Sequence, residues 1–487
     1  MKKLIPVFIF WQLVISQGFG QTPDICATPN IPFAEYKALR QSDLHLEFRA
    51  DTIIYVPLTI HIVGDDEGNG YYEPQNVMNS LCRLNADYEP YKIQFYVRGD
   101  WHYINSSRWY DHDTYSKGQE MFSANNVPRT MNCYIVKNPK GACGYAYINS
   151  YNMALGKNCL GSGNSTWSHE MGHALSLPHT FNGWEGTTIN TSNPTPSTIN
   201  GHEVEKADSS NCTTAADLFC DTPPDYLSFR WNCSTGMQSS TTYKDPNGKA
   251  FKVDGKNFMS YSDDVCASMF STEQVNAIKN NLLFAKAGMS TFEPPYELNT
   301  ISIAAVDPIL NGSVNPDSFA IQWTKVPNAT KYYLRLSKYS DFITFDTILF
   351  TQDTSVIIKK LLPSRRYYYT VTALNKFSFC NATTGVIRFN TNTLGTGGDL
   401  VNERDINIFP SCIAGQKSIS IEFFNIKNTG VLIELFSPLG VKLGQKPIEI
   451  YNQEYSISDL NLPFETGINI VRIKIGNQYI SKKIIKL

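Results

Sequence analysis

The alternation of apolar and polar positions divides the chain into a first part that mixes strands with helices and a second part made of strands. Residues 53–63 form an apolar run that predicts a buried strand, and residues 77–88 carry apolar positions at helical spacing. Shorter apolar runs at residues 93–97, 131–136 and 144–148 predict three more strands. We expect one mixed sheet with residues 144–148 at its edge, where an extended peptide could pair.

A second helix is predicted further along the first part. Its apolar positions follow the i, i+4, i+7, i+8 spacing of one helical face, at Trp167, Met171, Ala174 and Leu175. Pro178 should end this helix, because proline lacks a backbone N–H and disfavours helical backbone in the residue before it. A stretch rich in Ser, Thr and Asn at residues 186–200 then predicts an irregular subdomain with a surface loop.

The second part of the chain reads as two separate strand-rich modules. Pro294 and Pro295 mark a linker, and residues 297–395 then show the alternation of half-buried strands. Three glycines within residues 394–399 predict a flexible linker before a last strand-rich segment at residues 405–487. The pattern therefore predicts an α+β domain followed by two all-β sandwich domains.

The amino-terminal segment has the features of an export signal. Lys2 and Lys3 precede an apolar stretch at residues 4–15, which is too short to span a bilayer. We therefore predict a signal peptide at residues 1–20, with a membrane anchor as the alternative, and a short propeptide segment at residues 21–50. No other stretch is long and apolar enough to cross a membrane, so we expect a product that is secreted or held at the outer cell surface.

Composition and cysteine content agree with an exported protein. The 487 residues carry a net charge of −2 with 18% charged residues and no basic stripe, which argues against a nucleic-acid partner. Eleven cysteines in an exported chain imply disulfides, and the odd number leaves at least one cysteine outside an intramolecular pair. Three pairings are open for Cys212, Cys220, Cys233 and Cys266, and we expect that Cys133, Cys143 and Cys159 could pair as well.

The predicted second helix carries the candidate chemistry. His169 and His173 lie one turn apart on one face, where two imidazoles can hold one Zn²⁺. Glu170 lies beside them and can take a proton from a water on that metal. After the bend at Pro178, His179 can complete the ligand set. This arrangement predicts metal-assisted hydrolysis of a peptide bond.

Together with downstream motifs, this segment resembles the pappalysin family of metzincin metallopeptidases over roughly residues 50 to 290. The matching motifs are HExxHxxxxxH with Thr180-Phe181 after it, Cys220-Asp221-Thr222-Pro223, Asn257-Phe258-Met259-Ser260-Tyr261 and Phe270-Ser271-Thr272-Glu273-Gln274. The resemblance implies a metzincin catalytic domain at residues 51–292, with a mixed twisted sheet, a zinc-binding helix and an irregular C-terminal subdomain. One departure is Ser176, which stands where metzincins carry the glycine that turns the chain toward the third histidine.

The resemblance also implies roles outside the helix. Met259 would be the Met-turn residue beneath the zinc histidines, and Tyr261 would bind zinc or donate a hydrogen bond to the reaction intermediate. Cys26 lies in a segment similar to the cysteine switch of pappalysin zymogens, with Ala27 in place of glycine, and is a candidate thiolate cap on the zinc. An ordinary disulfide is the alternative for Cys26.

Further expectations concern the irregular subdomain. The resemblance suggests two bridges among its four cysteines and a structural Ca²⁺ beside the catalytic Zn²⁺. Asp263, Asp264 and Asp221 are candidates for calcium binding or for recognition of a basic substrate residue. Solvated carboxylates are the alternative for the first two.

The two strand-rich modules resemble other known domains. Residues 297–395 resemble a fibronectin type III domain, and residues 405–487 resemble the C-terminal sorting domain of the bacterial type IX secretion system. A carbohydrate- or protein-binding module is the alternative for the last segment. The expected partners are therefore protein or peptide substrates and the type IX secretion machinery.

Two other functions fit parts of this pattern. A gluzincin would take its third zinc ligand from a later acid such as Glu203 or Glu205, which His179 and Met259 argue against. A non-catalytic secreted adhesin would keep a structural zinc site, but such a site has no use for Glu170 as a general base. The leading prediction is therefore a secreted zinc endopeptidase made as a zymogen.

Overall fold

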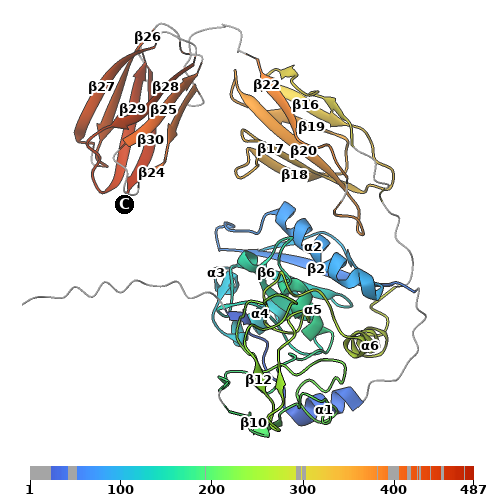
Figure 1. Cartoon of the computed structure of the whole chain (residues 1–487). Helices are drawn as coiled ribbons and strands as arrows, with labels where there is room; N and C mark the ends of the chain where they lie inside the picture. Colours follow the sequence, from blue (N-terminus) through green and yellow to red (C-terminus); the bar gives the residue numbers. More distant parts are fainter. Residues whose placement is uncertain are drawn as a thin grey trace, which may run out of the picture. The chain divides into compact units, whose positions relative to one another are not determined.

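The computed structural model describes most of the chain, in two compact units, Met1–Pro295 and Tyr296–Leu487 (Figure 1). The described residues are 24–41, 52–191, 193–291, 298, 303–380, 382–392, 405–413, 418–424, 426, 429–438, 440–450, 454–475 and 478–487. The predicted signal peptide at residues 1–20 and the end of the predicted propeptide, residues 42–50, lie outside these ranges.

The first unit is built around a seven-stranded mixed sheet in the order β1-β8-β9-β6-β2-β3, with β4 also paired to β2. Its strands are β1 (Asp24–Cys26), β2 (Ile54–Gly64), β3 (Ile93–Val97), β4 (His102–Asn105), β6 (Met131–Val136), β8 (Ala142–Ala146) and β9 (Asn152–Gly156). Every residue of β2 is buried, as expected for a central strand covered on both faces. Strand β2 runs parallel to β3, β4 and β6, whereas β8 runs antiparallel to β9.

One prediction about this sheet needs correction. We expected a strand at residues 144–148 to form the edge, but β8 begins two residues earlier and is covered by β1. Strand β1 pairs in parallel with β8, and Cys26 lies opposite Gly144. A segment of the predicted propeptide therefore occupies the position where an extended peptide was expected to pair.

Helices of the first unit cover the sheet, and α5 packs against β8 and β9 and also contacts α2. The helices are α1 (Phe33–Gln41), α2 (Pro74–Tyr88), α3 (Ser107–Tyr110), α4 (Tyr115–Asn125), α5 (Thr166–Ala174) and α6 (Thr272–Asn280), with short turns η1 (Glu89–Tyr91) and η2 (Lys157–Cys159) and a π-helical turn η3 (Asn281–Ala285). Helix α4 buries Met121 and Phe122 against Tyr134 and Tyr145 of the sheet. Helix α6 begins with a capping box between Ser271 and Gln274.

Between α5 and α6 the chain is mainly irregular, as the sequence predicts. Its regular pieces are the two-residue strands β10 (Thr198–Ile199), β11 (His202–Glu203), β12 (Tyr243–Lys244) and β13 (Ala250–Phe251), while β5 (Asp111–His112) and β7 (Asn138–Pro139) pair elsewhere in the unit. Large aromatic side chains, including Phe181, Trp184 and Tyr226, give this subdomain its own buried cluster, which Cys26 joins. The amino-terminal helix α1 lies against this region (Figure 1), where Phe33 makes an edge-to-face contact with His202.

The second unit contains two pairs of sheets. In the first pair, a three-stranded sheet β14-β16-β19 and a six-stranded sheet β15-β22-β20-β17-β18, with β21 on β20, share one buried cluster that includes Trp323, Tyr369 and Phe389. The strands are β14 (Ala305–Asp307), β15 (Ser313–Val314), β16 (Ser318–Trp323), β17 (Lys331–Ser337), β18 (Thr347–Thr351), β19 (Ser355–Lys359), β20 (Arg366–Leu374), β21 (Ala382–Thr383) and β22 (Ile387–Thr391).

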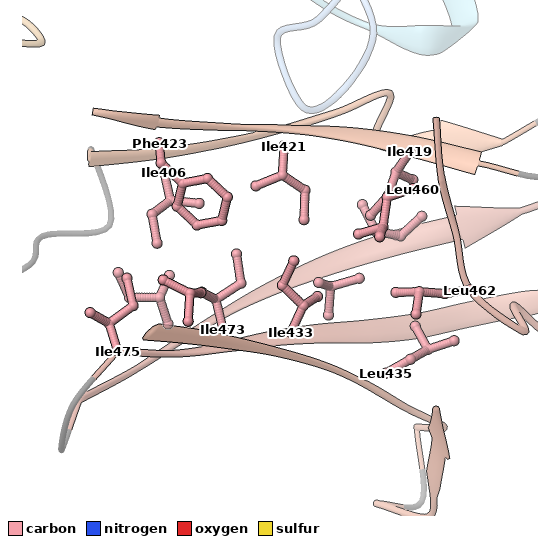
Figure 2. Packing of buried hydrophobic residues seen from close by; sticks show 14 of the residues in the cluster. Ile406, Ile419, Ile421, Phe423, Ile433, Leu435, Leu460, Leu462, Ile473 and Ile475 are labelled. Atoms are coloured by element: carbon pink, nitrogen blue, oxygen red, sulfur yellow. The ribbon is translucent and has the colours of Figure 1, made fainter. Parts of the chain in front are cut away.

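The second pair of sheets encloses an aliphatic core. Its sheets, β23-β25-β28 and β24-β30-β29-β26-β27, direct alternate residues inward, and Figure 2 shows Ile421 and Phe423 facing Ile433 and Ile473 across the interior. The strands are β23 (Ile406–Phe409), β24 (Cys412–Ile413), β25 (Ser418–Phe424), β26 (Thr429–Phe436), β27 (Lys442–Ile450), β28 (Glu454–Asn461), β29 (Gly467–Ile475) and β30 (Gln478–Lys486).

Across the described residues, none of the helices combines the length and apolar character that a membrane crossing requires.

Candidate metal centre

Helix α5 carries two of the three candidate ligands and is buried along its whole length. It begins after Ser165, whose own side chain caps no helical N–H. Instead, the carboxylate of Asp264 accepts hydrogen bonds from the backbone N–H and the hydroxyl of Ser165, at 2.9 and 2.6 Å. The negative charge of Asp264 therefore lies at the N-terminal end of the helix, where the helix dipole favours it.

The helix ends in a Schellman motif that turns the chain toward His179. The N–H of Leu177 donates to the carbonyl of Gly172 at 2.9 Å, and the N–H of Ser176 donates to the carbonyl of His173 at 3.0 Å. Ser176 has a φ of +84°, the left-handed conformation for which metzincins use glycine. The serine thus makes the same turn at a conformational cost, and His179 reaches the site.

The three histidine rings meet at their Nε2 atoms. The Nε2 of His173 lies 3.1 Å from that of His169 and 3.1 Å from that of His179. In a tetrahedral zinc site, Zn–N bonds of about 2.0–2.1 Å place two nitrogens roughly 3.3 Å apart. The spacing of the imidazoles therefore fits a single zinc ion.

Each ring is oriented by an acceptor on its other nitrogen. The Nδ1 of His169 donates to the carbonyl of Phe258 at 2.6 Å, that of His173 to the carbonyl of Leu177 at 2.7 Å, and that of His179 to the carboxylate of Glu185 at 3.3 Å. Because these acceptors fix the proton on Nδ1, the Nε2 lone pairs face one another. Burial lowers the pKa of His169 to about 3 and holds that of His173 well below its usual value, so both rings are neutral and can bind a metal.

Cys26 completes the cluster as a fourth donor. Its Sγ lies 3.6 Å from the Nε2 of His173, and the donor atoms of Cys26 and the three histidines all lie within 4.8 Å of one another. With a Zn–S bond of about 2.3 Å, a tetrahedral site would separate sulfur from nitrogen by roughly 3.5 Å. Burial, and then the charge of Glu170, raise the pKa of the free Cys26 thiol. A cation bound at the cluster would lower this pKa and favour the thiolate.

Glu170 lies beside the cluster and is completely buried. Its Oε2 accepts a hydrogen bond from the hydroxyl of Thr28 at 3.2 Å, and its Oε1 is buried without a partner. Burial raises the pKa of this carboxyl group to about 8. The absence of a side chain at Gly144 makes room for it, because a Cβ there would lie 2.8 Å from the Glu170 carboxylate.

Met259 and Tyr261 both lie close to the histidine cluster. A Cβ at Gly172 would lie 2.5 Å from the Met259 sulfur, so the methionine packs directly under the helix. The ring centroid of Tyr261 lies 5.8 Å from that of His169 and 5.0 Å from that of His179. The hydroxyl of Tyr261 donates to the carbonyl oxygen of Cys26 at 3.0 Å. The amino-terminal segment therefore engages the hydroxyl group that is predicted to donate a hydrogen bond to the reaction intermediate.

Several acidic candidates lie outside this cluster. Arg230 bridges Asp263 at 2.9 Å and Asp264 at 2.8 Å, so a calcium ion or a basic substrate residue would have to displace it. Asp221 accepts a hydrogen bond from the backbone N–H of Glu273 at the start of α6.

The two alternative zinc ligands also lie elsewhere. Glu203 accepts hydrogen bonds from Asn211 and Thr214, and Glu205 is buried apart from the cluster. Among the described residues, neither glutamate contributes to the group of atoms that could hold a metal.

The structure settles the geometry of three disulfides in this unit. Cys212 pairs with Cys220, Cys233 pairs with Cys266, and Cys143 pairs with Cys159. The first two close the irregular subdomain around the segment between His179 and Met259, and the third closes the loop after β8.

Three contacts at the site involve residues that no sequence motif identifies. Glu185, which orients His179, follows no recognised motif. Thr28 reaches Glu170 from far along the chain. The carboxylate of Asp225 accepts hydrogen bonds from the hydroxyls of Thr180 and Ser260, both at 2.7 Å, and so ties the segment after His179 to the segment that carries Met259.

Three buried imidazoles that converge beside a buried carboxylate define a metal-dependent hydrolase site, and comparisons with known proteins agree. The chain is similar to extracellular metalloprotease 1 of Coccidioides posadasii (strain C735), with 26% identity over 262 residues, covering 49% of this chain and 79% of the relative. An extracellular metalloprotease of Sordaria macrospora is 26% identical over 247 residues, covering 46% and 73%. One of Verticillium alfalfae is 25% identical over 247 residues, covering 46% and 74%. No family model matches the chain.

Solved structures show only distant likeness. A crystal structure of FN3tt covers 19% of this chain and 97% of its own, at 16% identity and a TM-score of 0.15. Dimeric latent PorU from Porphyromonas gingivalis covers 39% of this chain and 20% of its own, at 15% identity and a TM-score of 0.17. These TM-scores are too low to define a fold. The sequence relatives support a secreted metalloprotease, and the histidine cluster is a group of residues that could hold a metal ion.

Proposed function

We propose that this chain is the precursor of a secreted zinc endopeptidase of the pappalysin type. The observation that carries the proposal is the convergence of His169, His173 and His179 on one point, with each Nδ1 held by an acceptor, next to the buried carboxylate of Glu170. Zinc, when bound by these three imidazoles, supplies a Lewis acid that polarises the scissile carbonyl and lowers the pKa of a bound water.

The chain's own residues supply the proton transfers. Once Thr28 leaves, the Glu170 carboxylate is free to take a proton from the attacking water and to deliver it to the leaving amine. Tyr261, released from the carbonyl of Cys26, has a hydroxyl that can donate to the developing oxyanion. Met259 and Gly172 hold the helix from below, so the histidines keep their orientation during these steps.

The substrate is proposed to bind along β8. In the precursor, β1 pairs with this strand, and the backbone N–H of Ala27 donates to the carbonyl of Gly144 at 2.8 Å. Removal of residues 21–50 would expose the backbone N–H and C=O groups of β8, and an extended peptide satisfies such groups by strand addition. The same removal would take Cys26 away from the metal ligands, which makes the precursor a latent zymogen.

The two modules of the second unit are proposed to serve export and presentation. Residues 405–487 enclose a sandwich core, and their motifs resemble a type IX sorting domain. Residues 297–395 form the preceding pair of sheets, with motifs that resemble a fibronectin type III domain. Export of fusions between a reporter and residues 405–487 would test the sorting role.

The catalytic proposal is tested with the processed enzyme and its Glu170→Ala variant. We expect casein cleavage to fall by about 10²–10⁴-fold, the contribution typical of a general base, while one equivalent of zinc stays bound. Glu203→Ala is the matched control and should keep activity, because Glu203 bonds only to the loop at Asn211 and Thr214 among the contacts described. Full cleavage by Glu170→Ala would refute the assignment, and loss of zinc from Glu203→Ala would favour the gluzincin ligand set.

A further inference from the structure

A cavity of about 330 Å³ lies in the first unit, and none of its lining residues belongs to the metal centre. Three parts of the chain line it: residues 126–130 together with Asn132 of β6, Tyr151 and Asn152 at the start of β9, and Lys286, Ala287 and Met289 after η3. Its volume lies within the range of small-molecule sites, which is about 300–1,000 Å³.

The cavity contains a lysine without a counter-charge. Lys286 is only 1% exposed, and its Nζ donates to the side-chain oxygen of Asn149 at 2.9 Å and lies 4.7 Å from the ring centroid of Tyr151. Among the described residues, no carboxylate forms an ion pair with it, and burial alone lowers its pKa to about 7. Burying an ammonium group is costly unless an anion compensates it, so an anion bound beside Lys286 would favour the charged form of the lysine.

The other residues that line the cavity indicate which kind of molecule would carry such an anion. The exposed side chain of Arg129 adds a second cation at the cavity. Asn152 lines the same space, and its Oδ1 is buried without a hydrogen-bond partner. Val127 and Met289 add apolar surface. The cavity thus offers cationic groups that can pair with a carboxylate, an acceptor for an N–H donor, and an apolar surface on which an apolar side chain can pack.

We propose that this cavity binds the C-terminal residue of a peptide, that is, an N-acylated apolar amino acid. Its carboxylate would pair with Lys286 and Arg129, its amide N–H would donate to Asn152, and its side chain would pack on Val127 and Met289. A charged guanidinium and an ammonium suit a carboxylate, and the Oδ1 of Asn152, which has no hydrogen-bond partner among the described residues, suits an amide N–H. The shared chemistry covers both a free peptide product and the C-terminus of a partner protein.

Titration calorimetry of the full chain tests this inference with N-acetyl-L-leucine as the probe. We expect saturable binding, and at least tenfold weaker binding of N-acetyl-L-leucinamide, which lacks the charge. Lys286→Met should weaken binding of the acid at least tenfold. Lys279→Met is the matched control, because Lys279 is a partly buried lysine of α6 that does not line the cavity, and it should bind as the native chain does.

A second variant keeps the test informative if Lys286→Met fails to fold. Ala287 is exposed at the cavity, so Ala287→Phe should fill the space while leaving Lys286 in place, and it should also abolish binding. Equal binding of the acid and the amide would overturn the proposal, as would unchanged binding by Ala287→Phe. If the acid binds as proposed, a tetrapeptide ending in leucine and a protein with an exposed C-terminal leucine distinguish the two sources.

Discussion

Replacing Cys26 by alanine in the unprocessed chain should raise its peptidase activity. The thiol lies 3.6 Å from the Nε2 of His173 and completes the donor group with the three imidazoles. Cys26→Ala removes this donor but keeps the backbone contacts of the segment, including the hydrogen bond from Tyr261 to the carbonyl of residue 26. The variant therefore separates the role of the thiol from the role of strand pairing.

The size of the effect follows from the ligand count. Four-ligand structural zinc sites in peptides have apparent binding free energies of about 10–16 kcal/mol, so one ligand of four corresponds to about 3 kcal/mol. At about 1.4 kcal/mol per factor of ten, the fraction of precursor with an uncapped metal should rise about 100-fold. The strand pairing with β8 and the hydrogen bond from Thr28 to Glu170 remain, so activity should stay below that of the processed enzyme.

Two measurements check this expectation. The first is cleavage of a quenched fluorescent peptide by the purified precursor, native and Cys26→Ala, with Cys412→Ala as the control because Cys412 is an exposed free cysteine. The second is alkylation of Cys26, which should be slow with metal bound and fast after chelation. The reasoning would be refuted if the Cys26→Ala precursor cleaved the peptide no faster than the native precursor and if the alkylation rate of Cys26 were the same with and without metal.

Three further predictions address the site and its support. Ser176→Gly should stabilise the first unit by about 1 kcal/mol, because φ is +84° there, and a lower melting temperature than that of the native chain would contradict this. Gly172→Ala should destabilise it by about 1–3 kcal/mol and weaken zinc binding, because the added Cβ would lie 2.5 Å from the Met259 sulfur; unchanged zinc affinity by competition with a chelator would argue against this packing. Burial, and then the charges of Asp217 and Asp225, raise the pKa of Glu205 to about 9. The folded state therefore keeps a proton that the unfolded chain releases above pH of about 4.3, so stability should fall by up to about 1.4 kcal/mol per pH unit toward pH 9. Glu205→Gln should flatten this dependence in urea titrations at pH 5 and pH 9, and equal slopes for both proteins would disprove the assignment.

The apolar pattern locates strands best where both faces are buried. The strands predicted at residues 93–97 and 131–136 match β3 and β6 at both ends. Helix α2 begins at Pro74 rather than at residue 77, because Glu73 caps the helix and proline suits the first helical position. The spacing of apolar residues contains no information about either of these features.

Long-range pairing explains the main differences. Strand β1 has three residues and no alternation of its own, and it forms because β8, more than a hundred residues away, offers an open edge. The start of α5 shows the same limit on local reasoning. Ser165 is of a residue type that commonly caps a helix with its own side chain, whereas the acceptor at this helix start is Asp264, which lies 99 residues further along the chain.

The three candidate ligands could be proposed from the sequence because they lie close together along the chain, but the orientation of their rings could not. His169, His173 and His179 come from one segment of eleven residues. Their Nδ1 partners come from the segment before Met259, from the turn after α5 and from Glu185. Only the folded subdomain brings these acceptors together, so competence to bind metal depends on the whole unit rather than on the motif.

The same dependence explains how a short amino-terminal segment can hold the site inactive. Residues 24–28 place a sulfur beside the imidazoles, a hydroxyl on Glu170, a carbonyl on Tyr261 and a strand on β8. Under the proposed function, each contact would block a different requirement of peptide hydrolysis, namely an open metal position, a free base, an oxyanion donor and a place for the substrate backbone. The imidazoles themselves are held by acceptors outside this segment, so its removal changes access to the metal without disturbing the ligands. If the proposed function is right, activation should require cleavage of the chain, and single substitutions such as Cys26→Ala should release only part of the activity.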